Sequence, residues 1–114
     1  MARYTCRLTV AISPENLHHS LVEILQACNF EIIYDTNEYM MAREVPGQIT
    51  FSKLATAEVL VDNSKPHENA IGLNLVVKNE ELALQVNNHC QQMYELLQQT
   101  IYEHPHWQIL DLVQ

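Results

Sequence analysis

The sequence predicts an α+β fold, a two-layer sandwich in which two helices cover one face of a mainly antiparallel sheet of five to six strands. Apolar and polar residues alternate over residues 3–12, as in a strand with one buried face. Segments 13–28 and 79–103 instead carry apolar residues every three or four positions, as helices do. Since 114 residues suffice for one core, we expect a single domain over residues 1–114.

The first strand and first helix have the clearest signals. The alternating apolar positions of the strand are Tyr4, Cys6, Leu8, Val10 and Ile12. Ser13 then suits an N-cap and Pro14 the first helical turn. The apolar stripe of this helix consists of Leu17, Leu21, Ile24, Leu25 and Cys28. We therefore expect the helix to pack on the face of the sheet that the strand buries.

Residues 30–35 and 38–45 are predicted to form a hairpin, because both are rich in strand-forming residues and the turn-prone triplet 35–37 separates them. The expected register pairs Tyr34 with Tyr39, Ile32 with Met41 and Phe30 with Arg43. This register turns Arg43 toward the core. It places Ile33, Met40, Ala42 and Leu60 on the opposite face of the sheet.

Further strands are predicted over 48–53, 56–62 and 71–77, with a polar surface loop over 63–69. Asn79 is expected to cap a long helix that ends near Glu103, with Glu80 and Glu81 at its positive end. The expected apolar stripe of this helix consists of Leu82, Val86, Cys90, Met93, Leu97 and Ile101. The segment 107–113 either adds a short strand or docks. The resulting order, β-α-β-β-β-β-β-α, resembles helix-grip and TATA-binding-protein-like topologies, a likeness of fold that implies no function.

Composition excludes several classes of function. Fourteen acidic against six basic residues give a net charge of −8, which disfavours binding to nucleic acid or to an anionic membrane. The two glycines, Gly47 and Gly72, are too far apart for a dinucleotide fingerprint, a phosphate loop or a nucleophile elbow. No apolar run is long enough to span a bilayer, and the first residues do not resemble a secretory signal. We therefore expect a cytoplasmic protein.

Neither a metal site nor a cofactor is expected. His104, His106, His89 and Cys90 lack the spacing of a complete ligand set. Cys6, Cys28 and Cys90 fall on predicted core faces, where they act as small apolar residues. No nucleophile can be matched to a base, so the sequence favours a non-enzymatic protein without settling the question.

The leading functional hypothesis is a protein-interaction module that self-associates or binds a protein partner. Ile33, Met40 and Leu60 are its candidate interface, because they are apolar residues on a face expected to be solvated. The polar side of the long helix is a second candidate surface, formed by Gln85, Asn88, Gln91, Gln92, Glu95 and Gln99. Ile49 and Phe51 join the outer patch or return to the core, depending on the loop at Pro46; the core position is favoured.

The alternative hypothesis is a carrier or sensor of a small apolar or anionic ligand. Its pocket would lie between the sheet and the C-terminal helix. Arg43, with Tyr34 and Tyr39, would anchor an anionic group there, because arginine is rarely turned toward a core without a partner.

Overall fold

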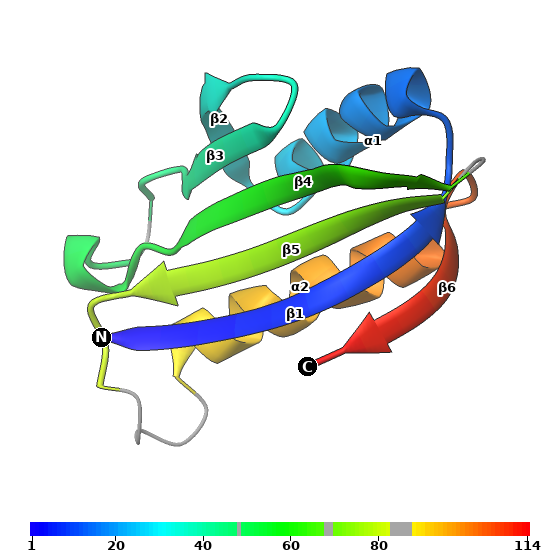
Figure 1. Ribbon diagram of the computed structural model, residues 1–114. Coiled ribbons are helices and arrows are strands. Elements are labelled where there is room, and N and C mark those ends of the chain that lie inside the picture. Colours follow the sequence, from blue (N-terminus) through cyan, green and yellow to red (C-terminus); the bar gives the residue numbers. More distant parts are fainter. Residues whose placement is uncertain (48, 68–69, 83–87) are drawn as a thin grey trace.

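The computed structural model describes residues 1–47, 49–67, 70–82 and 88–114, with the backbone alone for 63–67. Its elements are β1 (Ala2–Ala11), α1 (Pro14–Ala27), β2 (Phe30–Asp35), β3 (Tyr39–Glu44), the 3₁₀ helix η1 (Phe51–Lys53), β4 (Thr56–His67), β5 (Ala70–Asn79), α2 (His89–Glu103) and β6 (Gln108–Val113). Within the described residues, six strands form one sheet in the order β2-β3-β4-β5-β1-β6, and every pairing is antiparallel. Both helices cover the same face (Figure 1). The predicted fold class is confirmed.

The core lies between the helices and the face of the sheet that they cover, which we call the inner face. The predicted alternation in β1 is confirmed, since Cys6, Leu8 and Val10 are buried. Leu73, Leu75 and Val77 of β5 are buried beside them, as predicted. The predicted stripe of α1 and the residues Cys90, Met93, Leu97 and Ile101 of α2 close the core from the helical side.

The predicted start of α1 is confirmed. Ser13 is its N-cap, and the Ser13 hydroxyl accepts a hydrogen bond from the backbone N–H of Asn16. Asn29 follows the helix with a φ of 69°, a left-handed conformation that asparagine adopts more readily than most residues. This residue reverses the chain, so that β2 begins directly at Phe30.

The predicted register of the β2–β3 hairpin is wrong. The hydroxyl of Thr36 accepts hydrogen bonds from the N–H groups of Glu38 and Tyr39, and a bulge lies between Ile32 and Tyr34. Arg43 consequently pairs with Glu31 rather than with Phe30. A shift of one residue exchanges the two faces of a strand, so β3 turns Met40 inward and Arg43 outward.

Residues 48–53 do not form the predicted strand, as far as they are described. Because β3 pairs directly with β4, segment 45–55 connects two adjacent strands of the sheet. It forms the short helix η1, on which the side chain of Phe51 is 81% exposed. The expectation that Phe51 returns to the core is therefore wrong, and Ile49 is half-buried.

Two further boundaries differ from the prediction. A loop was predicted over residues 63–69, but β4 continues as far as His67. Residues 68–69 lie outside the described residues. The last segment adds a strand, β6, beside β1 at one edge of the sheet. Of the two alternatives predicted for residues 107–113, a short strand or a docked segment, the strand is observed.

The predicted start of the second helix is wrong. Asn79 ends β5, and α2 begins ten residues later at His89, with Asn88 as its N-cap. Leu82, expected in the apolar stripe, is 74% exposed, whereas Val86 lies outside the described residues. Asn88, expected on the polar side of the helix, is buried at the cap.

Candidate functional site

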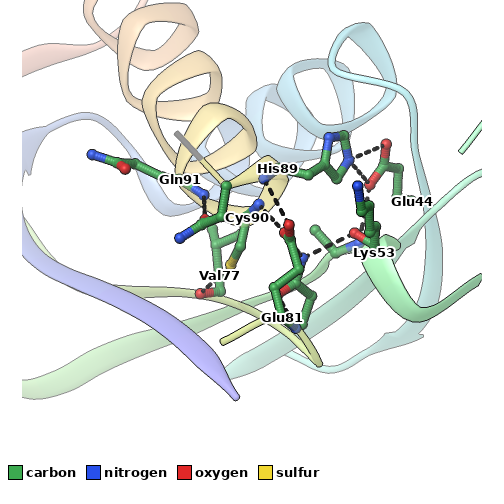
Figure 2. A network of polar contacts seen from close by, with 10 residues as sticks. Glu44, Lys53, Val77, Glu81, His89, Cys90 and Gln91 are labelled. Atoms are coloured by element: carbon green, nitrogen blue, oxygen red, sulfur yellow. Dashed lines mark hydrogen bonds and ion pairs between the residues drawn. The ribbon is translucent and has the colours of Figure 1, made fainter. Parts of the chain in front are cut away.

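A buried polar network holds the N-terminus of α2 against the ends of β3 and β5 (Figure 2). The carboxylate of Glu81 accepts hydrogen bonds from the backbone N–H groups of His89 at 3.2 Å and Cys90 at 2.9 Å. The side-chain oxygen of Asn88 accepts one from the N–H of Gln91 at 2.7 Å. The first N–H groups of a helix have no partner within the helix, so these side chains satisfy donors that would otherwise be buried without one.

Glu81 is itself held in place by Asn79. The side-chain amide of Asn79 donates to Glu81 and to the backbone carbonyl of Lys53, while its oxygen accepts from the N–H of Glu81 at 3.0 Å. Burial acts to raise the pKa of Glu81, but the hydrogen bonds from Asn79 and from the two backbone N–H groups outweigh it. The pKa of Glu81 therefore lies below its ordinary value, and the carboxylate stays charged beside the positive end of α2.

Glu44 and His89 form a second, adjoining pair. Nε2 of His89 lies 2.7 and 2.9 Å from the two carboxylate oxygens of Glu44, so this nitrogen carries the hydrogen. The backbone N–H of Ala55 also donates to Glu44, at 3.0 Å. Glu44 is almost wholly buried, and its partners account for both oxygens. The pair ties the first residue of α2 to the end of β3 and, through Ala55, to the residue before β4.

A histidine between a carboxylate and a cysteine can serve nucleophilic catalysis, but Cys90 is placed otherwise. Its thiol is fully buried and points to the carbonyl oxygens of Val77 at 3.4 Å and Ala2 at 3.8 Å. Burial raises the pKa of Cys90 to about 11, and the charges of Glu81 and Glu44 add to the effect. Cys90 is therefore an uncharged thiol that packs α2 on the sheet. Sequence reasoning missed this network, although Asn88 followed by Gln91 at the third helical position is a capping signal.

A cleft of about 470 Å³ opens between the first turns of α1, the β2–β3 turn and the inner face of β4 and β5. We call it the α1 cleft. Its apolar walls are Leu17, Leu21, Met40, Val61 and Ile71. Its polar lining includes Glu15, His18, Thr36, Asn37 and Tyr39. Nε2 of His18 lies at hydrogen-bond distance, 2.7 Å, from the carboxylate of Asp35. No sequence pattern indicated this cleft, because its walls come from elements far apart in the chain.

The three residues predicted to bind a ligand all lie on the outer face or its rim. The rings of Tyr34 and Tyr39 are neighbours, with centroids 5.8 Å apart, and the Tyr39 hydroxyl donates to Glu58. Arg43 is exposed on the outer face, so the predicted arginine between the sheet and α2 is wrong. Tyr39 also lines the α1 cleft, whereas Arg43 lines a separate cleft on the outer face.

Of the predicted interface residues, Ile33 and Leu60 are exposed on the outer face, as expected. Met40 is 3% exposed and belongs to the core. The bulge in β2 shifts the register of the hairpin, so Met40 lies on the inner face of the sheet instead of the outer face. The continuous apolar patch expected from these three residues is therefore absent from the described part of the outer face. A contact through Ile33 and Leu60 stays a prediction.

Several of the described histidines lie close to acidic side chains. His19 and His104 both lie within ion-pair distance of Glu23, and the rings of His104 and His106 are neighbours. Among the described residues, no three His, Cys, Asp or Glu side chains are grouped so that they could hold a metal ion. The absence of a metal stays a prediction.

Comparisons with protein-family models and with curated proteins find no match for this chain. No helix in the described ranges is both long and apolar enough to cross a membrane.

Proposed function

We propose that this protein is a non-enzymatic carrier or sensor of a small apolar ligand, and that the ligand binds in the α1 cleft. The observation that supports the proposal is a cleft of about 470 Å³ with apolar walls next to the hydrophobic core. Small-molecule sites are commonly of this size, mostly apolar, and supplied with a few polar groups.

The lining defines the class of ligand. Leu17, Leu21 and Ile71 suit an aliphatic or aromatic body. His18 and Asn37, among the polar residues of the lining, suit a single hydroxyl, amide or similar group. The ligand would lie between the sheet and a helix, as in the carrier hypothesis from the sequence, but the helix is α1 rather than α2.

Indole and 1-hexanol are suitable probes, with backbone amide shifts measured by NMR. We expect saturable shifts at α1 and at the β2–β3 turn. Val61→Phe fills the cleft from β4 and should weaken binding by about tenfold or more, equivalent to ~1.4 kcal/mol. Leu60→Phe, on the opposite face of the same strand, is the matched control and should bind as the wild type does.

The proposal fails if neither probe shifts these amides in a saturable way. It also fails if Val61→Phe binds with unchanged affinity while its melting temperature matches that of Leu60→Phe.

Self-association is the second candidate, and the observation that favours it is the edge strand β6. Leu110 and Val113 are exposed there, and an edge strand presents unpaired backbone groups to another chain. Light scattering should then return about twice the chain mass of 13.2 kDa, and Leu110→Lys should return one chain mass. A wild type that stays at one chain mass at micromolar concentration contradicts this candidate.

A further inference from the structure

Three of the six basic residues lie in one row across the outer face of the sheet. Arg43 on β3 pairs with Thr56 on β4, Thr56 pairs with Lys78 on β5, and Lys78 pairs with Arg3 on β1. Residues directly opposite one another on neighbouring strands project from the same face. We call these four residues the cation row. Neither α1 nor α2 contains a lysine or an arginine.

The cation row is costly for a folded sheet, because like charges on opposite residues repel. Glu58 offsets part of this cost: it forms an ion pair with Lys78 and accepts a hydrogen bond from Tyr39 at 2.9 Å. Arg43 has Glu31 as its cross-strand neighbour, yet its guanidinium forms no hydrogen bond or ion pair with any described residue. The guanidinium donors of Arg43 are therefore left unused by the described part of the chain.

A cleft of about 780 Å³ covers this part of the outer face, and we call it the outer-face cleft. Arg43, Thr56 and Lys78 line it together with Ile33, Phe51 and Leu54. Glu31, Glu44 and Glu80 are the acidic residues of its lining, and Glu44 is already bound to His89 and Ala55. The cleft thus brings two cations beside an exposed aromatic ring and an exposed isoleucine.

We infer that the outer-face cleft binds an anion, a carboxylate or a phosphate, that is carried on an apolar body. Neighbouring strands are about 4.8 Å apart, so the backbones of Arg43 and Lys78 lie roughly 10 Å from each other, and both long side chains can reach one anion above Thr56. Phe51 and Ile33 contact the apolar body. The net charge of −8 opposes approach to an anionic membrane, which favours a free molecule over a lipid in a bilayer.

Sodium octanoate is the probe, and the shifts of the backbone amides near Arg43, Thr56 and Lys78 are the measurement. We expect saturable shifts at these amides. Arg43→Gln should weaken octanoate binding by about tenfold or more, and Phe51→Ser should weaken it by a smaller factor. Arg7→Gln is the matched control: Arg7 is also an outer-face cation, but it pairs with Asp62 outside this cleft, and octanoate affinity should not change.

The inference is overturned if octanoate produces no saturable shift at these amides, or if Arg43→Gln and Arg7→Gln bind it equally. Acetate or inorganic phosphate binding as tightly as octanoate would overturn the apolar part of the assignment. If the protein binds vesicles of phosphatidylcholine and phosphatidylglycerol but does not bind octanoate, the inference that the ligand is a free molecule is wrong. Arg43, Thr56 and Lys78 line the outer-face cleft and none of them lines the α1 cleft, so the outcome is independent of the α1 cleft.

Discussion

The two helices begin in different surroundings. At α1, one exposed side chain, Ser13, accepts a single long hydrogen bond of 3.4 Å from Asn16. At α2, Asn88 and Glu81 are both buried and together accept hydrogen bonds from three successive backbone N–H groups. The first arrangement involves neighbours in the sequence, whereas the second brings in Glu81, which lies beyond the end of β5.

The difference bears on stability. An exposed N–H group that loses its cap binds water instead, so a solvated cap contributes little. A buried N–H group that loses its acceptor has no substitute, and the full cost of its desolvation remains. The N-terminus of α2 should therefore be much more sensitive to substitution than that of α1.

The largest effect is expected for Glu81→Ala, which removes the acceptor for His89 and Cys90 and a partner of Asn79. We expect a loss of about 3 kcal/mol in the free energy of unfolding, measured by urea denaturation. Glu80→Ala, at the exposed neighbouring position, should change it by less than about 0.5 kcal/mol. Equal losses in the two variants would contradict the capping role of Glu81.

Asn88→Ala should cost about 2 kcal/mol, because Asn88 caps Gln91 and also donates to the hydroxyl of Tyr4 at 2.8 Å. Tyr4→Phe removes only the second contact and should cost about 1 kcal/mol. The same denaturation experiment separates the two contributions. If Tyr4→Phe costs as much as Asn88→Ala, the cap itself contributes nothing.

The network should also make stability depend on pH. The pKa of Glu81 is lower in the folded protein than its ordinary value of 4.5, so the unfolded chain takes up the proton first as the pH falls. The stabilisation by this carboxylate is therefore present above pH 4.5 and is lost below it. Glu81→Gln should be less stable than the wild type at neutral pH, and the difference in urea midpoint should narrow in acid. A constant difference would show that Glu81 does not titrate as argued.

The smallest effect is expected for Ser13→Ala, with a loss of about 0.5 to 1 kcal/mol, since its hydrogen bond is long and solvated. Ser13→Asp keeps a capping oxygen and adds a negative charge at the positive end of α1, so its urea midpoint should equal or exceed that of the wild type. A loss for Ser13→Ala as large as that for Asn88→Ala would remove the distinction between the two helices.

The hairpin shows why part of the candidate site could not be predicted. Tyr34 and Tyr39 are close, as expected, and Arg43 is a cation without a partner among the described residues. The predicted side of the sheet was wrong for Arg43 and Met40, because a hydrogen bond from the Tyr39 N–H to the Thr36 hydroxyl and one extra residue at Ile33 shift the register. Alternation within one strand indicates which residues share a face. It does not indicate which face meets the helices.

Features that depend on near neighbours could be predicted from the sequence: the α+β class, the buried alternation of β1 and β5, and the extent of α1 with its local cap. The position at which α2 begins, the face to which β3 turns Arg43 and the structure of residues 49–55 became clear only from the packed molecule. They depend on partners that are far apart along the chain. Glu81 lies eight residues from His89, Glu44 lies 45 residues from it, and the cation row joins strands from Arg3 to Lys78. Such contacts form only when the whole core has packed, so no local pattern carries them.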